Sequence, residues 1–137
     1  MIVGIGTDLI SISRVQNLLF KFKEKFEEKI FTQKEIAKAQ NIKIGDENFS
    51  PRSAFYAKRF AAKESFAKAL GLGIGRGVDF KDIEIDNDAQ GKPFIQIING
   101  KKEFVENHFA LKNLAIHLSL TDEKNSAFAT VIIEKIL

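Results

Sequence analysis

The chain has 137 residues, of which 45% are hydrophobic and 28% are charged. This size and composition exclude global disorder and predict one globular domain spanning residues 1–137. Because the chain contains no cysteine, it can form no disulfide framework, thiolate metal site or cysteine nucleophile, which is typical of a reducing compartment. Its formal net charge of +3 suits an anionic partner, but no polybasic block indicates nucleic acid binding.

The first apolar segment, residues 1–5, is too short for a signal peptide, and no run approaches the ~20 residues that span a bilayer. We therefore expect a cytoplasmic protein with no membrane partner. Residues 2–6 predict a short buried strand, whose two glycines indicate close approach by another backbone or by a ligand. Asp8 would follow at a strand-to-helix junction, with Ser11 as the N-cap of the next helix. A capping or turn aspartate and a functional carboxylate are both open interpretations of Asp8.

Several short helices and one long helix are predicted between residues 12 and 70. Aromatic and aliphatic side chains at helical spacing indicate a helix over residues 20–31, either separate or continuing the first one. Thr32 and Glu35 have the spacing of a capping box, which predicts a short helix to about residue 40 and then a polar loop over 41–49. Ser50 and Pro51 provide an N-cap and a first-turn proline for a long helix that ends near Leu70.

The remaining elements are mostly strands. Alternating polarity predicts strands over 80–86 and 93–98, joined by turn residues into a hairpin. A weakly amphipathic helix is expected over 101–110. Two apolar strands over 113–121 and 126–136 then predict the central hairpin of the sheet. Because helices and strands come in blocks, the fold class is α+β, with a largely antiparallel sheet packed against the long helix and short helices.

The long helix ends in a charged stripe that runs into a glycine-rich segment, Gly71 to Gly77. At about 3.6 residues per turn, Glu64 and Lys68 lie along one stripe, with further basic side chains beside it. On this stretch alone, a solvent-exposed ion pair between Glu64 and Lys68 is the favoured interpretation. The glycine segment is neither a Walker A loop nor a dinucleotide fingerprint. It predicts a helix C-cap with a flexible turn, or a bare backbone that a bulky ligand can approach.

Candidate catalytic groups are few. His108 and His117 are not at metal-ligand spacing, and alternation along a strand does not support a triad near residues 117–122. Two carboxylates remain, Asp8 and Glu64. Magnesium is usually held by one or two carboxylates, with waters and substrate phosphate completing the shell. The spacing in the sequence does not place Asp8 and Glu64 together.

Four segments, in order over nearly the whole chain, resemble one known family. They are residues 2–10, 59–71, 91–93 and 117–121, and Phe31-Thr32 with Glu35 fits the same pattern. The chain is similar to the holo-acyl-carrier-protein synthases, the small bacterial 4′-phosphopantetheinyl transferases. The resemblance implies that family's α+β fold and a homotrimer with active sites at the subunit interfaces.

The resemblance also implies a reaction in fatty acid biosynthesis. The 4′-phosphopantetheine arm of coenzyme A would pass to a serine of apo acyl carrier protein, with Mg²⁺, to give holo carrier protein and 3′,5′-ADP. By position, Asp8 and Glu64 are implied as catalytic metal ligands, Lys68 as a catalytic contact of the transferred phosphate, and Arg14 as a carrier-protein contact. The implied coenzyme A contacts are Arg59, Lys63, Lys68, Gly71, Gly73, Lys92, Pro93, Ser119 and Thr121.

The chain departs from the family at Asp122, where many members have histidine, so any role of that histidine cannot be carried over. The general base and any carrier-protein contacts in the segment 40–53 are left open. A second class also remains open, a non-catalytic and mildly basic α+β module that binds an acidic protein.

Overall fold

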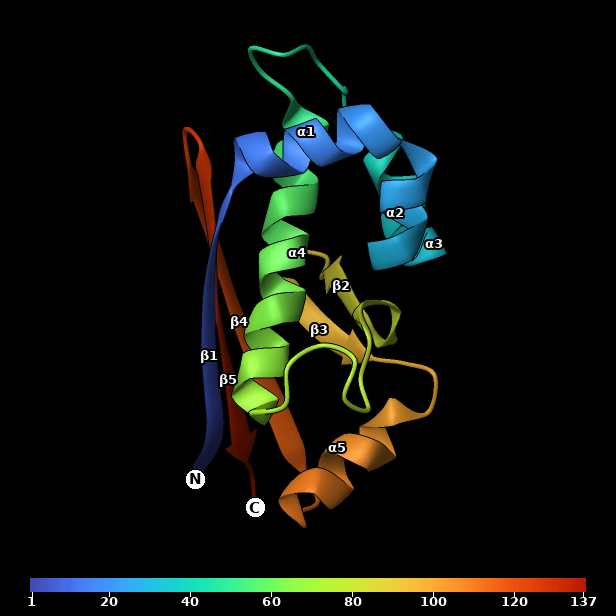
Figure 1. Ribbon diagram of the computed structural model, residues 1–137. Coiled ribbons are helices and arrows are strands. Elements are labelled where there is room, and N and C mark those ends of the chain that lie inside the picture. Colours follow the sequence, from blue (N-terminus) through green and yellow to red (C-terminus); the bar gives the residue numbers. More distant parts are fainter.

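The computed structural model describes residues 1–137. In chain order the elements are β1 (Ile2–Ser11), α1 (Ile12–Phe22), α2 (Glu24–Ile30), α3 (Gln33–Ala39), α4 (Pro51–Leu70), the 3₁₀ turn η1 (Phe80–Asp82), β2 (Ile83–Asn87), β3 (Pro93–Ile97), α5 (Lys101–Phe109), β4 (Leu114–Glu123) and β5 (Ser126–Lys135). Figure 1 shows α4 lying along one face of the larger sheet, with α1 to α3 toward its N-terminal end and α5 near its C-terminal end. The predicted α+β class is confirmed.

Two antiparallel sheets carry the fold. The larger has the strand order β1-β5-β4, and the smaller consists of β2 and β3. The expected hairpin of the last two strands is confirmed, but only β5 is central. The prediction that both strands are central was wrong, because β1 pairs with the other side of β5 and leaves β4 at an edge.

Two glycines of β1 let α4 lie directly on the sheet. A Cβ added at Gly6 would lie 1.9 Å from the backbone oxygen of Ser65, and one added at Gly4 would lie 2.3 Å from that of Ala69. Both neighbours are main-chain atoms of α4, which a rotamer change cannot move. The glycines therefore serve the approach of another backbone, one of the two roles predicted for them.

Replacing Gly6 tests this close approach. Gly6→Ala should lower the free energy of unfolding by about 1–3 kcal/mol, because the new methyl group must push α4 away from β1. Urea denaturation monitored by circular dichroism measures the loss. Glu103→Gln, at an exposed position of α5, should change stability by less than about 0.5 kcal/mol. Equal stability of the Gly6 variant and the wild type would contradict the packing.

The predicted helix caps are present. Ser11 accepts a hydrogen bond from the Arg14 amide, and Ser50 caps α4 through the Ser53 amide. Thr32 and Glu35 form both bonds of the capping box. These caps depend on bonds between residues three positions apart, which is why local sequence predicted them.

Two predicted strand boundaries were wrong. β1 does not end at Gly6 but continues to Ser11, because its pairing with β5 persists to Ser126. Asp8 therefore lies inside the strand, opposite Ala129, and not at a strand-to-helix junction. The strand expected from residue 80 begins at Ile83, since residues 80–82 form a 3₁₀ turn with a capping box between Asp79 and Asp82.

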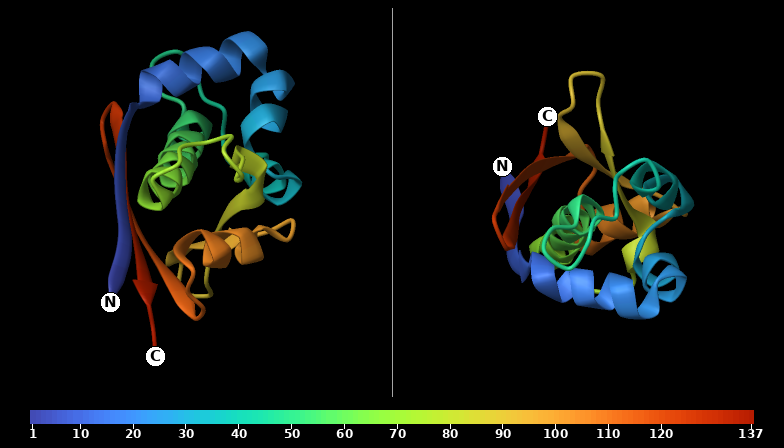
Figure 2. Two further views of the ribbon diagram at one scale, coloured as in Figure 1. Left: turned by 60° about the horizontal axis from the view of Figure 1, so that its bottom comes forward. Right: turned by 90° about the horizontal axis from the view of Figure 1, so that it is seen from above.

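The face of the large sheet opposite α4 is left uncovered. Ile5 and Leu9 of β1 are 63% and 67% exposed, and Phe128 of β5 is 36% exposed. In Figure 2 the helices lie on the other side of this sheet in both views, and the turn between β2 and β3 projects from the body. No helix is long and apolar enough to cross a membrane. The sheet thus has one packed face and one apolar face in contact with solvent.

Candidate active site

Asp8 points toward α4. Side chains alternate along a strand, so Asp8 shares the face of Gly4 and Gly6, on which the helix packs. Its side chain is only 17% exposed, and its Oδ1 accepts a hydrogen bond of 3.1 Å from Lys68 Nζ. Lys68 also donates to the carbonyl of Thr7 at 2.9 Å. The close approach allowed by the two glycines therefore brings a carboxylate of β1 against the last turn of α4.

Glu64 joins this cluster from one turn earlier in α4. Partial burial raises the pKa of the Glu64 carboxyl above its usual range, and the negative charge of Asp8 raises it further. The nearby positive charges of Lys68 and Arg14 oppose this rise in the pKa. Asp8, Glu64, Lys68 and Arg14 thus interact as one group, although 56 residues separate the two carboxylates in the sequence.

The expected surface ion pair between Glu64 and Lys68 is not formed. Lys68 lies within ion-pair distance of Asp8, and Glu64 is within that distance of no basic group. The interpretation favoured by the helical stretch alone was therefore wrong. The helix spacing cannot reveal the competing partner, because Asp8 reaches Lys68 from a different element.

The donor set fits a hard divalent cation. Burial first, and then the negative charge of Asp8, raises the pKa of the Glu64 carboxyl, and a cation bound between the two carboxylates would offset both effects. No third histidine, cysteine or carboxylate completes a cage. Such a pair, with waters and a substrate phosphate, matches the way in which proteins hold Mg²⁺.

Lys63, for which the resemblance implied a coenzyme A contact, lies in the core with its ammonium group enclosed. Its side chain is 0% exposed, and Nζ donates to Glu35 at 2.7 Å, to the Phe80 carbonyl at 2.9 Å and to the Ile30 carbonyl at 3.0 Å. All three ammonium hydrogens are thereby used. Burial lowers the pKa of the Lys63 ammonium, and the charge of Glu35 opposes this shift. Lys63 therefore ties α4 to the chain around α3 and η1.

Arg59 is also largely buried, with 4% of its surface exposed. It donates to the Ile85 carbonyl and to Asn87, and its guanidinium lies 3.8 Å from Glu35. Part of the Arg59 side chain borders a pocket of about 130 Å³, which Pro93 also lines. Arg59 is a candidate ligand contact only through this part.

The glycine segment begins with the predicted C-cap. Gly71 has a left-handed backbone (φ of 77°), and its amide donates to the Lys68 carbonyl. A Cβ added at Gly71 or at Gly73 would meet nothing within 4 Å. The backbone beside Lys68 is therefore open to a ligand, as the second interpretation of this segment requires.

The other predicted coenzyme A contacts lie apart from this cluster. Ser119 and Thr121 point to the uncovered face of the sheet, opposite the face that carries Asp8. Lys92 and Pro93 line a pocket of about 290 Å³ between the β2–β3 turn and β4. Within one copy of the chain, these predicted contacts therefore lie apart from the carboxylate pair.

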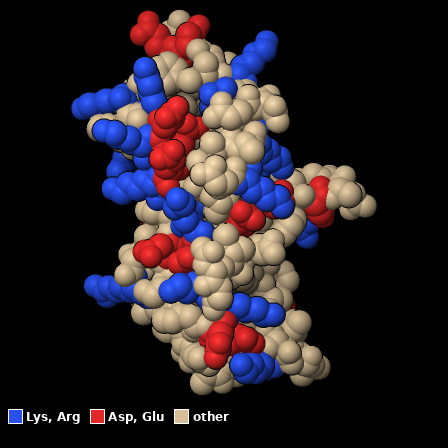
Figure 3. Space-filling view, turned by 90° about the vertical axis from the view of Figure 1, so that its right-hand side faces the viewer, with Lys and Arg blue, Asp and Glu red and all other residues tan.

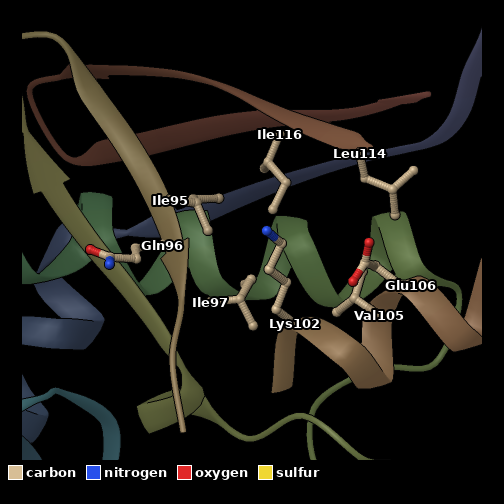
Figure 4. Close-up of a pocket in the computed structure, with 8 residues that line it drawn as sticks. All are labelled: Ile95, Gln96, Ile97, Lys102, Val105, Glu106, Leu114 and Ile116. Carbon is tan, nitrogen blue, oxygen red and sulfur yellow. The ribbon is translucent and has the colours of Figure 1, made fainter. Parts of the chain in front are cut away.

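A further pocket of about 340 Å³ lies between β3, β4 and α5 (Figure 4). It is lined by Ile95, Gln96, Ile97, Lys102, Val105, Glu106, Leu114 and Ile116. None of these residues was predicted from the sequence, and none belongs to the Asp8 cluster. The pocket is therefore separate from the carboxylate pair.

Sequence reasoning missed two tertiary contacts of the segments that it left open. Asp122, where the resemblance implied histidine in many members of that family, lies 3.7 Å from Lys58 of α4. The loop over 41–49 is held in place, because Gln16 donates to the Glu47 carbonyl and Arg52 donates to the Ile42 carbonyl. No local pattern signals either contact, since each joins residues at least ten positions apart.

The sequence and the fold both have known relatives. Residues 4–130 match the family described as the 4′-phosphopantetheinyl transferase superfamily. A holo-[acyl-carrier-protein] synthase of Anaplasma phagocytophilum is 44% identical over 131 residues, which cover 96% of this chain and 97% of the relative. One of Rhizobium meliloti is 44% identical over 135 residues, covering 98% and 92%.

Solved structures agree with these relatives. A holo-(acyl-carrier-protein) synthase from Bacillus anthracis, in complex with CoA (3′,5′-ADP), has a TM-score of 0.79 and 38% identity, covering 99% of each chain. The synthase from Neisseria meningitidis has a TM-score of 0.84 and 37% identity, covering 98% of this chain and 100% of that one. The chain therefore belongs to the holo-[acyl-carrier-protein] synthase family of phosphopantetheinyl transferases.

Proposed function

We propose that the chain transfers the 4′-phosphopantetheine group from coenzyme A to a serine of apo acyl carrier protein, in a Mg²⁺-dependent reaction of fatty acid biosynthesis. The observation that carries this proposal is the meeting of Asp8 and Glu64 beside Lys68, next to an open glycine backbone. Membership of the family supports the class of reaction. A cytoplasmic location stays a prediction.

The reaction is a phosphoryl transfer that needs no protein nucleophile. The serine hydroxyl of the carrier protein attacks the β-phosphorus of coenzyme A, and the bond from that phosphorus to the bridging oxygen breaks. The carrier serine gains the phosphopantetheine arm, its proton is lost, and 3′,5′-ADP leaves. Negative charge develops on the bridging and non-bridging oxygens, so positioned positive charge supplies most of the stabilisation.

In this cluster, the carboxylates would bind the cation and the lysine would bind a phosphate oxygen. Asp8 and Glu64 would hold Mg²⁺, which when bound neutralises charge on the diphosphate and orients it. Lys68 is 55% exposed, so its ammonium can turn from Asp8 to a phosphate oxygen of the substrate. The open backbone at Gly71 and Gly73 leaves room for the substrate beside Lys68.

We expect a homotrimer with shared active sites. The predicted contacts Ser119 and Thr121 lie on the sheet face opposite Asp8, which supports a site that a second copy completes. The same face exposes Ile5, Leu9 and Phe128, and an apolar surface of this kind is typical of a subunit interface. A neighbouring copy packed there would complete the site.

The carrier protein would dock beside the carboxylate pair. Arg14 in α1 lies close enough to Glu64 for its positive charge to oppose the rise in the pKa of that carboxyl. An apolar pocket of about 390 Å³ between α1, α2 and α4 contains Phe22 and Phe60 and is flanked by Lys25 and Lys29. Figure 3, which views the molecule from the side of α2 and α3, shows basic side chains with acidic ones among them. Basic side chains around an apolar pocket suit an acidic helix with an apolar face.

Arg14→Ala tests the docking assignment. The variant should raise the KM for apo carrier protein about three- to tenfold, the usual range for one interfacial charge, with the Kd for coenzyme A changed less than twofold. Steady-state transfer rates and calorimetric titration of coenzyme A measure the two quantities. Arg14→Lys, which keeps the charge, should recover part of the loss. Equal loss of both affinities would contradict a role confined to the carrier.

Mass spectrometry of the carrier protein tests the proposed function. The protein is incubated with coenzyme A, Mg²⁺ and an apo carrier protein. The mass of the carrier protein should then increase by that of one phosphopantetheine arm. The alternative of a non-catalytic module for an acidic partner predicts that the carrier binds but its mass does not change. An unchanged mass under these conditions would overturn the proposed function.

A further inference from the structure

Helix α5 contacts the two ends of the glycine segment 71–77, at Leu70 just before it and at Gly77. Phe104 of α5 packs on Gly77, where an added Cβ would lie 2.1 Å from the Phe104 ring. Gly77 has a φ of 99°, a backbone conformation that side chains other than glycine rarely adopt. The end of the segment is therefore fixed by an aromatic ring on one side and by its own backbone geometry.

His108 of α5 holds the beginning of the same segment. Its Nε2 lies 2.7 Å from the carbonyl oxygen of Leu70, the last residue of α4. A carbonyl only accepts, so Nε2 carries the proton and donates. The neighbouring carbonyls of α4 are satisfied by the segment's own amides, from Gly71 to Lys68 and from Gly73 to Ala67. His108 makes the hydrogen bond that Leu70 lacks from the backbone.

The His108 ring is itself held in place. It stacks on Phe104 with a centroid distance of 6.4 Å and an interplanar angle of 8°, and it meets Phe109 edge to face at 4.9 Å. Phe109 in turn packs near Gly4 of β1, 3.5 Å from an added Cβ. The three aromatic side chains therefore connect β1, the end of α4 and the glycine segment.

We infer that His108 is a positioning residue that fixes the glycine segment 71–77 for coenzyme A. Gly71 follows Leu70 directly, so the hydrogen bond from His108 to the Leu70 carbonyl fixes the start of the open backbone at Gly71 and Gly73. This inference rests on the proposed function, since it requires coenzyme A to lie beside this segment. The partners of His108 are Leu70, Phe104 and Phe109. We therefore expect His108 to affect the binding of coenzyme A and not the carboxylate pair or the carrier-protein contact in α1.

Two substitutions separate the hydrogen bond from the packing. His108→Phe keeps an aromatic ring against Phe104 and removes the donor, whereas His108→Gln places an amide nitrogen near the position of Nε2. We expect His108→Phe to raise the KM for coenzyme A about three- to tenfold, the effect of one lost hydrogen bond, with kcat and the KM for carrier protein changed less than twofold. His108→Gln should restore most of the affinity. Glu103→Gln, at an exposed position of the same helix, should match the wild type.

A second readout does not depend on catalysis. Amide hydrogen exchange over residues 71–77 should be about three- to tenfold faster in His108→Phe than in the wild type or in His108→Gln. An unchanged KM for coenzyme A in His108→Phe would overturn the inference, as would a uniform loss of kcat and of both affinities. If the wild type does not transfer the arm, the proposed function fails, and the exchange rates alone decide whether His108 fixes the segment.

Discussion

Glu64→Gln is expected to abolish Mg²⁺-dependent transfer, with a fall in kcat of at least about 100-fold. The substitution keeps the size of the side chain but removes one of the two negative charges that would hold the cation. The folded state already disfavours the Glu64 charge, because burial and Asp8 raise the pKa of its carboxyl. At pH 7 the neutral amide should therefore leave the free energy of unfolding unchanged or slightly higher. Transfer rates and urea denaturation measure the two effects.

The matched control for this variant is Glu103→Gln, which makes the same change at an exposed position of α5. It should retain the wild-type rate and stability. A Glu64→Gln protein that modified the carrier at the wild-type rate would contradict the metal assignment. A loss of activity accompanied by a large loss of stability would indicate a structural role instead.

Lys63→Met should lower the free energy of unfolding by about 3–5 kcal/mol. The variant leaves Glu35 fully buried without its closest cation, and it leaves the carbonyls of Ile30 and Phe80 without their donor. Urea denaturation monitored by circular dichroism measures the loss. Lys58→Met, on the same helix but 35% exposed and 3.7 Å from its partner Asp122, should cost less than about 1 kcal/mol.

A double variant identifies the cause of this loss. Adding Glu35→Gln to Lys63→Met removes the unpaired buried charge, so the double variant should be more stable than Lys63→Met alone. If Lys63→Met were as stable as Lys58→Met, the buried network would not support the fold. Coenzyme A affinity that fell without any loss of stability would restore Lys63 as a ligand contact.

The local features of the fold could be predicted from the sequence. The caps at Ser11, Thr32 and Ser50 and the left-handed Gly71 depend on neighbours a few residues away, and all four are present. Boundaries set by tertiary pairing could not be predicted. β1 extends past Gly6 because β5, more than 100 residues later, continues to pair with it.

In the site too, the arrangement of residues within one helix could be predicted from the sequence, whereas contacts between elements could not. Spacing along α4 places Glu64 and Lys68 on one stripe but says nothing about Asp8, which only the packing of β1 on α4 supplies. Lys63 and Lys68 are chemically alike in the sequence and lie five residues apart. One is 0% exposed and the other 55% exposed, because Glu35 and the chain around η1 cover one side of α4 and leave the other open.

The role of the Asp8 and Glu64 pair is tested most directly by counting the cations that it binds. Electron paramagnetic resonance of Mn²⁺, used in place of Mg²⁺, measures bound metal in the presence of saturating coenzyme A. The wild type should bind about one Mn²⁺ per chain through these carboxylates, and the Asp8→Asn/Glu64→Gln double variant should bind none at the same concentration. Wild-type stoichiometry and affinity in the double variant would contradict the assignment of this pair as the metal site.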